Sequence, residues 1–152
     1  MTVLRAIISW VNARHHARWH TFADSLYSPH PALSYCTKLR VLSLSSSGPR
    51  IAWIISALKS VKSSNIRQVS WDYFAHEESR EVVLERLRGM NIDEILSSSQ
   101  FSGLRGFTLA IIGAHADDGD GQWSSSVCSM LPNAHERGIL SFKIIDLDPN
   151  AR

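Results

Sequence analysis

The sequence predicts an α/β fold: a short, irregular solenoid whose parallel strands follow one another in sequential order, with helices on one side. Segments of the form LxxLxL recur along the chain. Each of these segments alternates apolar and polar residues with the period of two that is typical of a half-buried strand. Between them, apolar residues recur at spacings of three and four, as in amphipathic helices. Strands that alternate with helices indicate parallel pairing through right-handed crossovers.

The first 35 residues are expected to form an N-terminal cap and an irregular first repeat. A capping helix is predicted because an open solenoid end would expose its core. Its apolar residues share one helical face: Leu4, Ile7, Ile8 and Val11. A weak repeat is indicated by Trp19 and Phe22 with Asp24, and a turn by Tyr27 to Pro31.

Residues 36–146 are expected to form four repeats, each with one strand. The apolar slots of the four strands are Leu39, Leu42 and Leu44; Ile66, Val69 and Trp71; Leu104, Phe107 and Leu109; and Ile139, Phe142 and Ile144. The residues between these slots are small or polar, so one face of the sheet is predicted to be buried and the other open. The later repeats are longer than the 20–29 residues of regular leucine-rich repeats, because of fuller helices and a loop at 113–121.

Helices are expected between these strands. Gly48 and Pro49 lead into a helix over 51–61, because proline suits the first helical turn. A second helix is predicted over 77–88, with Gly89 as its C-terminal cap, and a short one over 92–96. A further helix over 123–130 is expected to stop at Pro132, and residues 147–152 form a tail of the single domain 1–152.

Composition excludes several classes of protein. The 152 residues suit one domain, and 44% hydrophobic with 20% charged residues argues against a disordered or fibrous chain. No apolar run is long enough to cross a membrane. Cys36 and Cys128 lack the spacing of a zinc site or a disulfide framework, so they are expected to be buried thiols in a reducing compartment. Without a signal-peptide pattern, the expected location is intracellular, either cytoplasmic or nuclear.

Few residues suggest a metal-binding or catalytic site. The loop from His115 to Gly121 contains three aspartates, but its glycines do not fit the register of a calcium loop. His16 and His20 lie four apart, but no HExxH motif surrounds them. No GxSxG motif is present for a nucleophilic serine. We therefore expect no catalytic residues, no metal and no cofactor.

Binding to nucleic acid is not indicated for the body of the chain. Trp53 and Trp71 fall in apolar stripes and are expected to be core residues. Residues 1–50 carry six Lys or Arg against one acid, so only this first third of the chain is basic.

A doubly wound enzyme or nucleotide-binding domain is the alternative. Its site would lie at the carboxyl ends of the strands, near Ser47, Tyr73, His115 and Asp146. The turn from Ser45 to Arg50 has neither GxGxxG nor a P-loop motif, which argues against a phosphate cradle. Strand order separates the two folds, because a doubly wound sheet reverses its order and has helices on both faces.

Several segments together resemble the leucine-rich-repeat-like C-terminal region of F-box proteins from mushroom-forming fungi. The segments are KLRVLSL, RIAWIISAL, IRQVSWDYF, FSGLRGFTLAI and LPNAHERGILSFKI, which span roughly residues 35–146. The F-box itself is not found in the 152 residues, and the asparagine ladder of regular repeats is replaced by Ser47 and Phe74. The resemblance implies a repeat region that holds the target of a ubiquitin ligase.

We therefore expect a non-enzymatic protein–protein interaction module whose partner is another protein. Exposed strand faces of repeat proteins present side chains at regular intervals to a partner. The predicted contact residues are those of the polar strand face: Val41, Ser43, Gln68, Ser70, Asp72, Thr108, Ser141 and Lys143.

Overall fold

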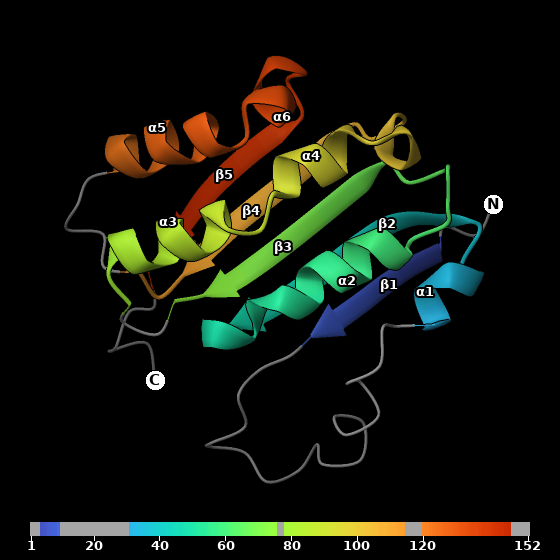
Figure 1. The fold of residues 1–152 in the computed structure, drawn as a ribbon, viewed down its shortest axis with the longest axis horizontal. Coiled ribbons are helices and arrows are strands. Elements are labelled where there is room, and N and C mark those ends of the chain that lie inside the picture. Colours follow the sequence, from blue (N-terminus) through green and yellow to red (C-terminus); the bar gives the residue numbers. More distant parts are fainter. Residues whose placement is uncertain (1–3, 10–30, 76–77, 115–119, 147–152) are drawn as a thin grey trace, which may run out of the picture.

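The computed structural model describes residues 4–9, 31–75, 78–114 and 120–146, and within them the chain forms a five-stranded parallel sheet (Figure 1). The strands are β1 (Leu4–Ser9), β2 (Leu39–Ser47), β3 (Gln68–Phe74), β4 (Gly106–Ile112) and β5 (Leu140–Ile145). Their spatial order is β1-β2-β3-β4-β5. The predicted α/β class, parallel pairing and sequential order are confirmed.

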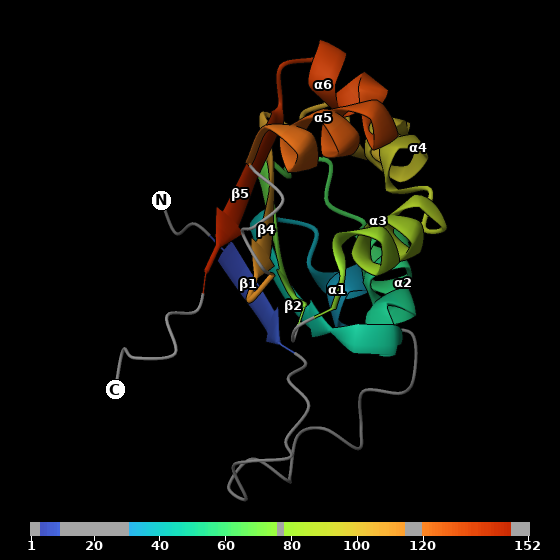
Figure 2. The ribbon, with the colours of Figure 1, turned by 90° about the vertical axis from the view of Figure 1, so that its left-hand side faces the viewer.

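Helical segments connect the strands and lie on one side of the sheet (Figure 2). They are α1 (Pro31–Tyr35), η2 (Gly48–Ile51), α2 (Ala52–Ser60), α3 (Arg80–Arg88), α4 (Ile92–Ser97), η3 (Ser99–Phe101), α5 (Asp120–Met130) and α6 (Pro132–Glu136). Right-handed crossovers that always advance in the same direction place every helix on the same face. The opposite face of the sheet is therefore left without a helical layer among the described residues.

The prediction of an N-terminal capping helix is wrong, because residues 4–9 form a strand. β1 pairs with β2 from Leu4 opposite Leu39 to Ser9 opposite Ser45, with a register shift after Leu4. A run of Ile7 and Ile8 suits a strand as well as a helix, since β-branched residues pack well on a pleated surface. Pairing with β2 decides between the two structures. Val11 and the weak repeat at Trp19 and Phe22 lie outside the described residues.

The fourth repeat is shifted by two residues from its predicted alignment. Leu140 lies opposite Phe107, and Phe142 lies opposite Leu109, although Phe142 was expected to align with Phe107. The shift arises because Leu140, which the LxxLxL alignment left at a variable position, is apolar and takes the place opposite Phe107. A shift of two residues keeps each side chain on its predicted face.

Pro132 begins a helix, although it was expected only to end one. Leu131, which precedes α6, supplies no side-chain cap. Instead the buried carboxylate of Asp93 accepts hydrogen bonds from the backbone N–H groups of Asn133 and Ala134, both at 3.0 Å, and from Asn133 Nδ2 at 2.7 Å. A carboxylate at this position satisfies free N–H groups and interacts favourably with the helix dipole. The short α1, which begins at Pro31, was likewise not predicted.

One hydrophobic core fills the space between the sheet and the helices. Leu42 and Leu44 of β2, and Val69 and Trp71 of β3, are at most 1% exposed. The same layer contains Phe107 and Leu109 of β4, Ile54 and Leu58 of α2, Val83 of α3, Leu96 of α4, and Trp123 and Val127 of α5. Phe142 of β5 stacks on Trp123, with ring centroids 6.5 Å apart. The predicted inward slots are therefore the core slots, and the faces of the strands are confirmed.

Polar side chains link successive repeats through backbone carbonyl groups. The buried Ser63 hydroxyl donates to the carbonyls of Thr37 and Leu39, at 3.0 and 2.8 Å. Gln100 donates to the carbonyl of Leu58 at 2.9 Å, and Arg137 donates to the carbonyls of Leu96 and Phe101. Apart from that of Thr37, these carbonyl groups lie near the ends of a strand or a helix, so the bonds tie the ends of neighbouring elements together.

A fully buried polar contact between side chains joins β2 to β3. Trp71 Nε1 donates to the Ser46 hydroxyl at 2.8 Å, and both residues are 0% exposed. Ser46 stands in a core position of β2, and Trp71 fills the next row of β3. The serine thus gives a buried indole the acceptor that it needs.

Replacing Ser46 with Ala is expected to destabilise the protein by about 1–3 kcal/mol, because the buried indole N–H loses its acceptor. Urea unfolding monitored by tryptophan fluorescence measures the change. Ser45→Ala, at the neighbouring half-buried position on the other face, is the matched control and should cost far less. Equal losses in the two variants would show that the hydrogen bond is not responsible.

Candidate functional site: the open face of the sheet

The face of the sheet opposite the helices is organised in rows that run across the strands. The first row contains Val41, Gln68 and Gly106, which are partners in the registers of β2, β3 and β4. The rows repeat every second residue, because alternate side chains of a strand point to the same face. We call this surface, from Val41 to Ile145, the open face.

From β2 to β5, the second row is made of hydroxyl side chains. These lie directly opposite one another on the four strands: Ser43, Ser70, Thr108 and Ser141. On β1, Ile7 is the register partner of Ser43. Ser70 donates a hydrogen bond to the Ser43 hydroxyl at 3.0 Å. Hydroxyl groups donate and accept, so this row can bind either kind of polar partner group.

A hollow of about 410 Å³ lies over the first two rows, between β2 and β4. Its lining residues are uncharged: Val41, Ser43, Gln68, Val69, Ser70, Gly106 and Thr108. Gly106 is one of these lining residues, and it has no side chain to fill the space beside it. The contact prediction omitted Gly106, although the position of this glycine on the polar strand face was visible in the sequence.

The remaining rows change character toward the carboxyl ends of the strands. The third contains Ser45, Asp72, Ala110 and Lys143, so opposite charges flank a small apolar residue. The fourth contains Ser47, Phe74, Ile112 and Ile145. Ile145 is 43% exposed, which gives this end of the open face an apolar side chain in solvent.

The structure places all eight predicted contact residues on the open face. Gln68, Ser141 and Lys143 are exposed, whereas Ser43, Ser70, Asp72, Thr108 and Val41 are half-buried between their neighbours. They occupy three consecutive rows and four strands. Their role in binding stays a prediction.

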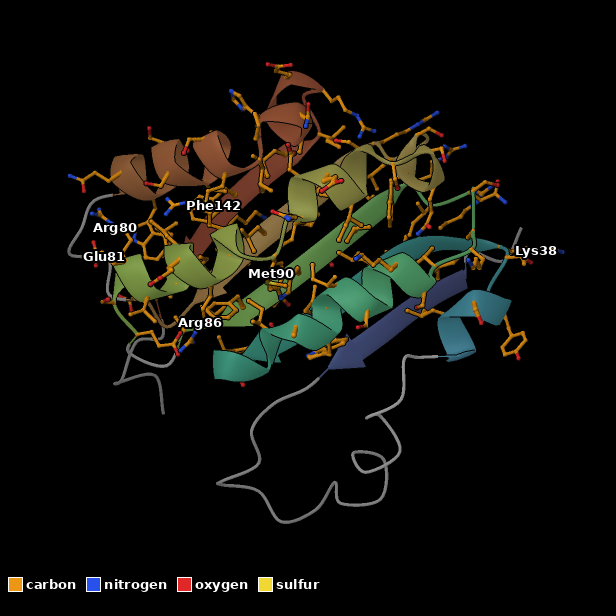
Figure 3. The ribbon with its side chains drawn as sticks, in the orientation of Figure 1. Lys38, Arg80, Glu81, Arg86, Met90 and Phe142 are labelled. Atoms are coloured by element: carbon orange, nitrogen blue, oxygen red, sulfur yellow. The ribbon has the colours of Figure 1, made fainter. Side chains whose placement is uncertain are left out.

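The helical side carries a larger groove of about 890 Å³ between α2 and the α3–α4 pair. Ile51, Ile55, Met90 and Ile95 give it apolar walls, and Lys59, Glu85 and Glu94 are among its charged lining residues. Figure 3 labels Met90 on this side of the sheet. Histidine and cysteine are absent from the described residues that line it.

Tyr73, at the carboxyl end of β3, belongs to a polar cluster on the helical side. Its hydroxyl donates to Glu78 Oε2 at 2.6 Å and accepts from Arg86 Nη1 at 3.0 Å, while Arg86 also forms an ion pair with Glu78. Burial, followed by the hydrogen bond to Glu78, raises the pKa of Tyr73 from 10.0 to about 12. The bond to Glu78 likewise raises the pKa of Arg86. A tyrosine with this pKa stays protonated near neutral pH, so its hydroxyl remains the donor to Glu78.

Metal binding finds no support in the described part of the chain. Within it, no group of three or more His, Cys, Asp or Glu side chains could hold a metal ion. His16, His20 and the loop residues 115–119 lie outside the described residues. Cys36 and Cys128 are free thiols, but both are half-buried, so the expectation of full burial is wrong. Across the described residues, no helix has the length and apolar character needed to span a membrane.

The doubly wound alternative is contradicted by the strand order. A doubly wound sheet reverses direction at a switch point, and that point creates the crevice for its ligand. Here the order runs from β1 to β5 without reversal, so no such crevice exists among the described strands. Ser47, Tyr73 and Asp146 are at strand ends as expected, but Ser47 is on the open face and Tyr73 is in the core.

Comparisons with protein-family models, curated proteins and solved structures gave no match.

The Tyr73 cluster predicts a specific loss of stability in alkali. Because the pKa is higher in the folded state than in the unfolded state, the contribution of Tyr73 is complete below pH 10 and is lost as pH rises toward 12. The loss attributable to this group is roughly 2–3 kcal/mol at most. Urea unfolding across this range should show a steeper decline for the wild type than for Tyr73→Phe. Parallel declines would mean that the two states hold this proton equally.

Proposed function

We propose that the chain is a leucine-rich-repeat-like solenoid that binds another protein through the open face, without enzymatic activity. The observation that carries this proposal is the sequential parallel order, which leaves one face of the sheet without a helical layer among the described residues. A face of this kind presents side chains in fixed rows, and neighbours within a row are about 4.8 Å apart along the hydrogen-bonding direction. Such spacing suits recognition of an extended surface, as in other repeat proteins.

The chemistry of the face also supports protein binding. It combines hydroxyl groups, an amide, two separated charges and the apolar Ile145, so it offers hydrogen-bond donors, acceptors and an apolar contact to a partner. The hollow at Gly106 offers a place for one partner side chain. With the resemblance to the repeats of F-box proteins, this leads us to propose that the bound protein is the target of a ubiquitin ligase.

Thr108→Glu is expected to abolish capture of the partner, because it places a larger charged side chain at the centre of the hydroxyl row. The experiment is affinity capture from an extract of the cells that express the protein, with quantitative comparison of the captured proteins. Ser56→Glu, an exposed position on α2, is the matched control on the opposite layer. Circular dichroism should show that both variants are folded.

Partners retained by the wild type and Ser56→Glu, but lost from Thr108→Glu, would support binding through the open face. Partners retained by all three proteins would exclude this face as the contact surface. Loss from Ser56→Glu alone would instead assign binding to the helical layer.

A further inference from the structure

Basic residues gather at the edge of the sheet where the strands begin. The described segments that lead into β2, β3, β4 and β5 are 36–40, 61–67, 98–105 and 136–139. They contain six basic residues, Lys38, Arg40, Lys62, Arg67, Arg105 and Arg137, and one acidic residue, Glu136. We call these six residues the basic edge. Parallel strands all begin at the same edge, so residues far apart in the sequence come together there.

Three arginines of the basic edge form a row along successive strands. Arg67 N donates to the carbonyl oxygen of Arg40 at 2.8 Å, and Arg105 N donates to that of Arg67 at 2.8 Å. Each arginine follows the first apolar residue of its repeat, which is Leu39, Ile66 or Leu104. With strands about 4.8 Å apart, the row spans about 10 Å at the backbone.

No carboxylate neutralises this row within the described part of the chain. Arg40 and Arg105 are exposed, and Arg67 is half-buried with its Nη1 on the carbonyl of Gly103 at 2.7 Å. The opposite end of the sheet differs, because Arg80 and Arg86 there pair with Glu81 and Glu78. Figure 3 shows Lys38 at one end of the molecule and this paired cluster at the other.

The arginine row adjoins the uncharged hollow of the open face. Arg40, Arg67 and Arg105 directly precede Val41, Gln68 and Gly106, which line that hollow. None of the three arginines is among the residues that line the hollow, so their charge is available to a ligand only where it extends past the hollow to the edge at which these strands begin. Guanidinium groups bind carboxylates with charge-assisted and often bidentate hydrogen bonds.

We propose that the partner presents an acidic extended segment, which lies across β2–β4 with its carboxylates on the arginine row and its small side chains over the hollow. This inference rests on the proposed function and names the chemistry of the partner. In an extended chain, side chains on the same edge repeat about every 6.6–6.8 Å, so two carboxylates fit a row of three arginines.

Peptide binding fits the surface better than nucleic acid. The rows beside the arginines carry hydroxyl, amide and glycine residues, with no aromatic platform on which bases could stack. The basic edge is also short compared with the sites of about 4–16 nucleotides that single strands occupy.

The test uses fluorescence anisotropy with the whole chain and a labelled twelve-residue peptide of alternating Ser and Glu. The matched probes are the alternating Ser and Lys peptide and a twelve-nucleotide oligothymidylate. We expect only the acidic peptide to bind, with affinity falling about fivefold or more between 50 and 300 mM NaCl. Arg40→Glu and Arg105→Glu should each weaken binding about tenfold, because each reverses one charge in the row. Arg88→Glu, an exposed position on α3, should leave it unchanged.

Absence of acidic-peptide binding, or an equal loss with Arg88→Glu, would overturn the inference. Tighter binding of oligothymidylate than of the acidic peptide would overturn it in favour of nucleic acid. Its failure is distinguishable from failure of the proposed function. If Thr108→Glu loses a captured protein that Arg40→Glu and Arg105→Glu retain, the open face binds a partner that is not acidic.

Discussion

The structure depends on one constraint: every crossover between strands advances in the same direction across the sheet. A right-handed crossover places its helix on a fixed side of the sheet, and a constant direction of advance repeats that choice at every step. The inward slots of successive strands then stack into a single apolar layer, from Leu44 through Trp71 and Leu109 to Phe142. One face becomes the core and the other becomes available for contact.

The polar contacts that accompany this core work locally. Ser63, Gln100 and Arg137 each bond a backbone carbonyl near the end of a neighbouring strand or helix, and the carboxylate of Asp93 caps α6. A different side chain therefore serves at each of these junctions.

Much of the fold could be predicted from the sequence because its patterns have physical periods. Buried and less buried residues alternate throughout β3 and over the central residues of β2 and the first half of β4, and the helix over Ala52–Ser60 follows an apolar stripe. The N-terminal strand could not be distinguished from a helix, since Leu4, Ile7 and Ile8 satisfy both patterns and only pairing with β2 decides. The alignment of β5 was ambiguous for a similar reason. Leu140 is a further apolar residue of this strand, so more than one set of residues could fill the apolar positions of LxxLxL. Helix α6 was missed because its cap comes from Asp93, far away in the sequence.

The candidate site was partly visible for the same reason. Alternation identified the polar strand face and with it the eight expected contact residues. The arginine row was missed, because Arg40, Arg67 and Arg105 are isolated in the sequence and form no charge run. Only the parallel register brings them together.

The fixed register of the open face has a consequence for how such a surface can diverge. The backbone ladder sets the distances between the side chains of a row, so a substitution at Thr108 or Ser141 changes the chemistry of one point while the backbone positions of its neighbours stay fixed. Their side chains contribute little to the core on the other face. The side chains of the open face can therefore change from one set to another while the core residues that stabilise the fold stay the same.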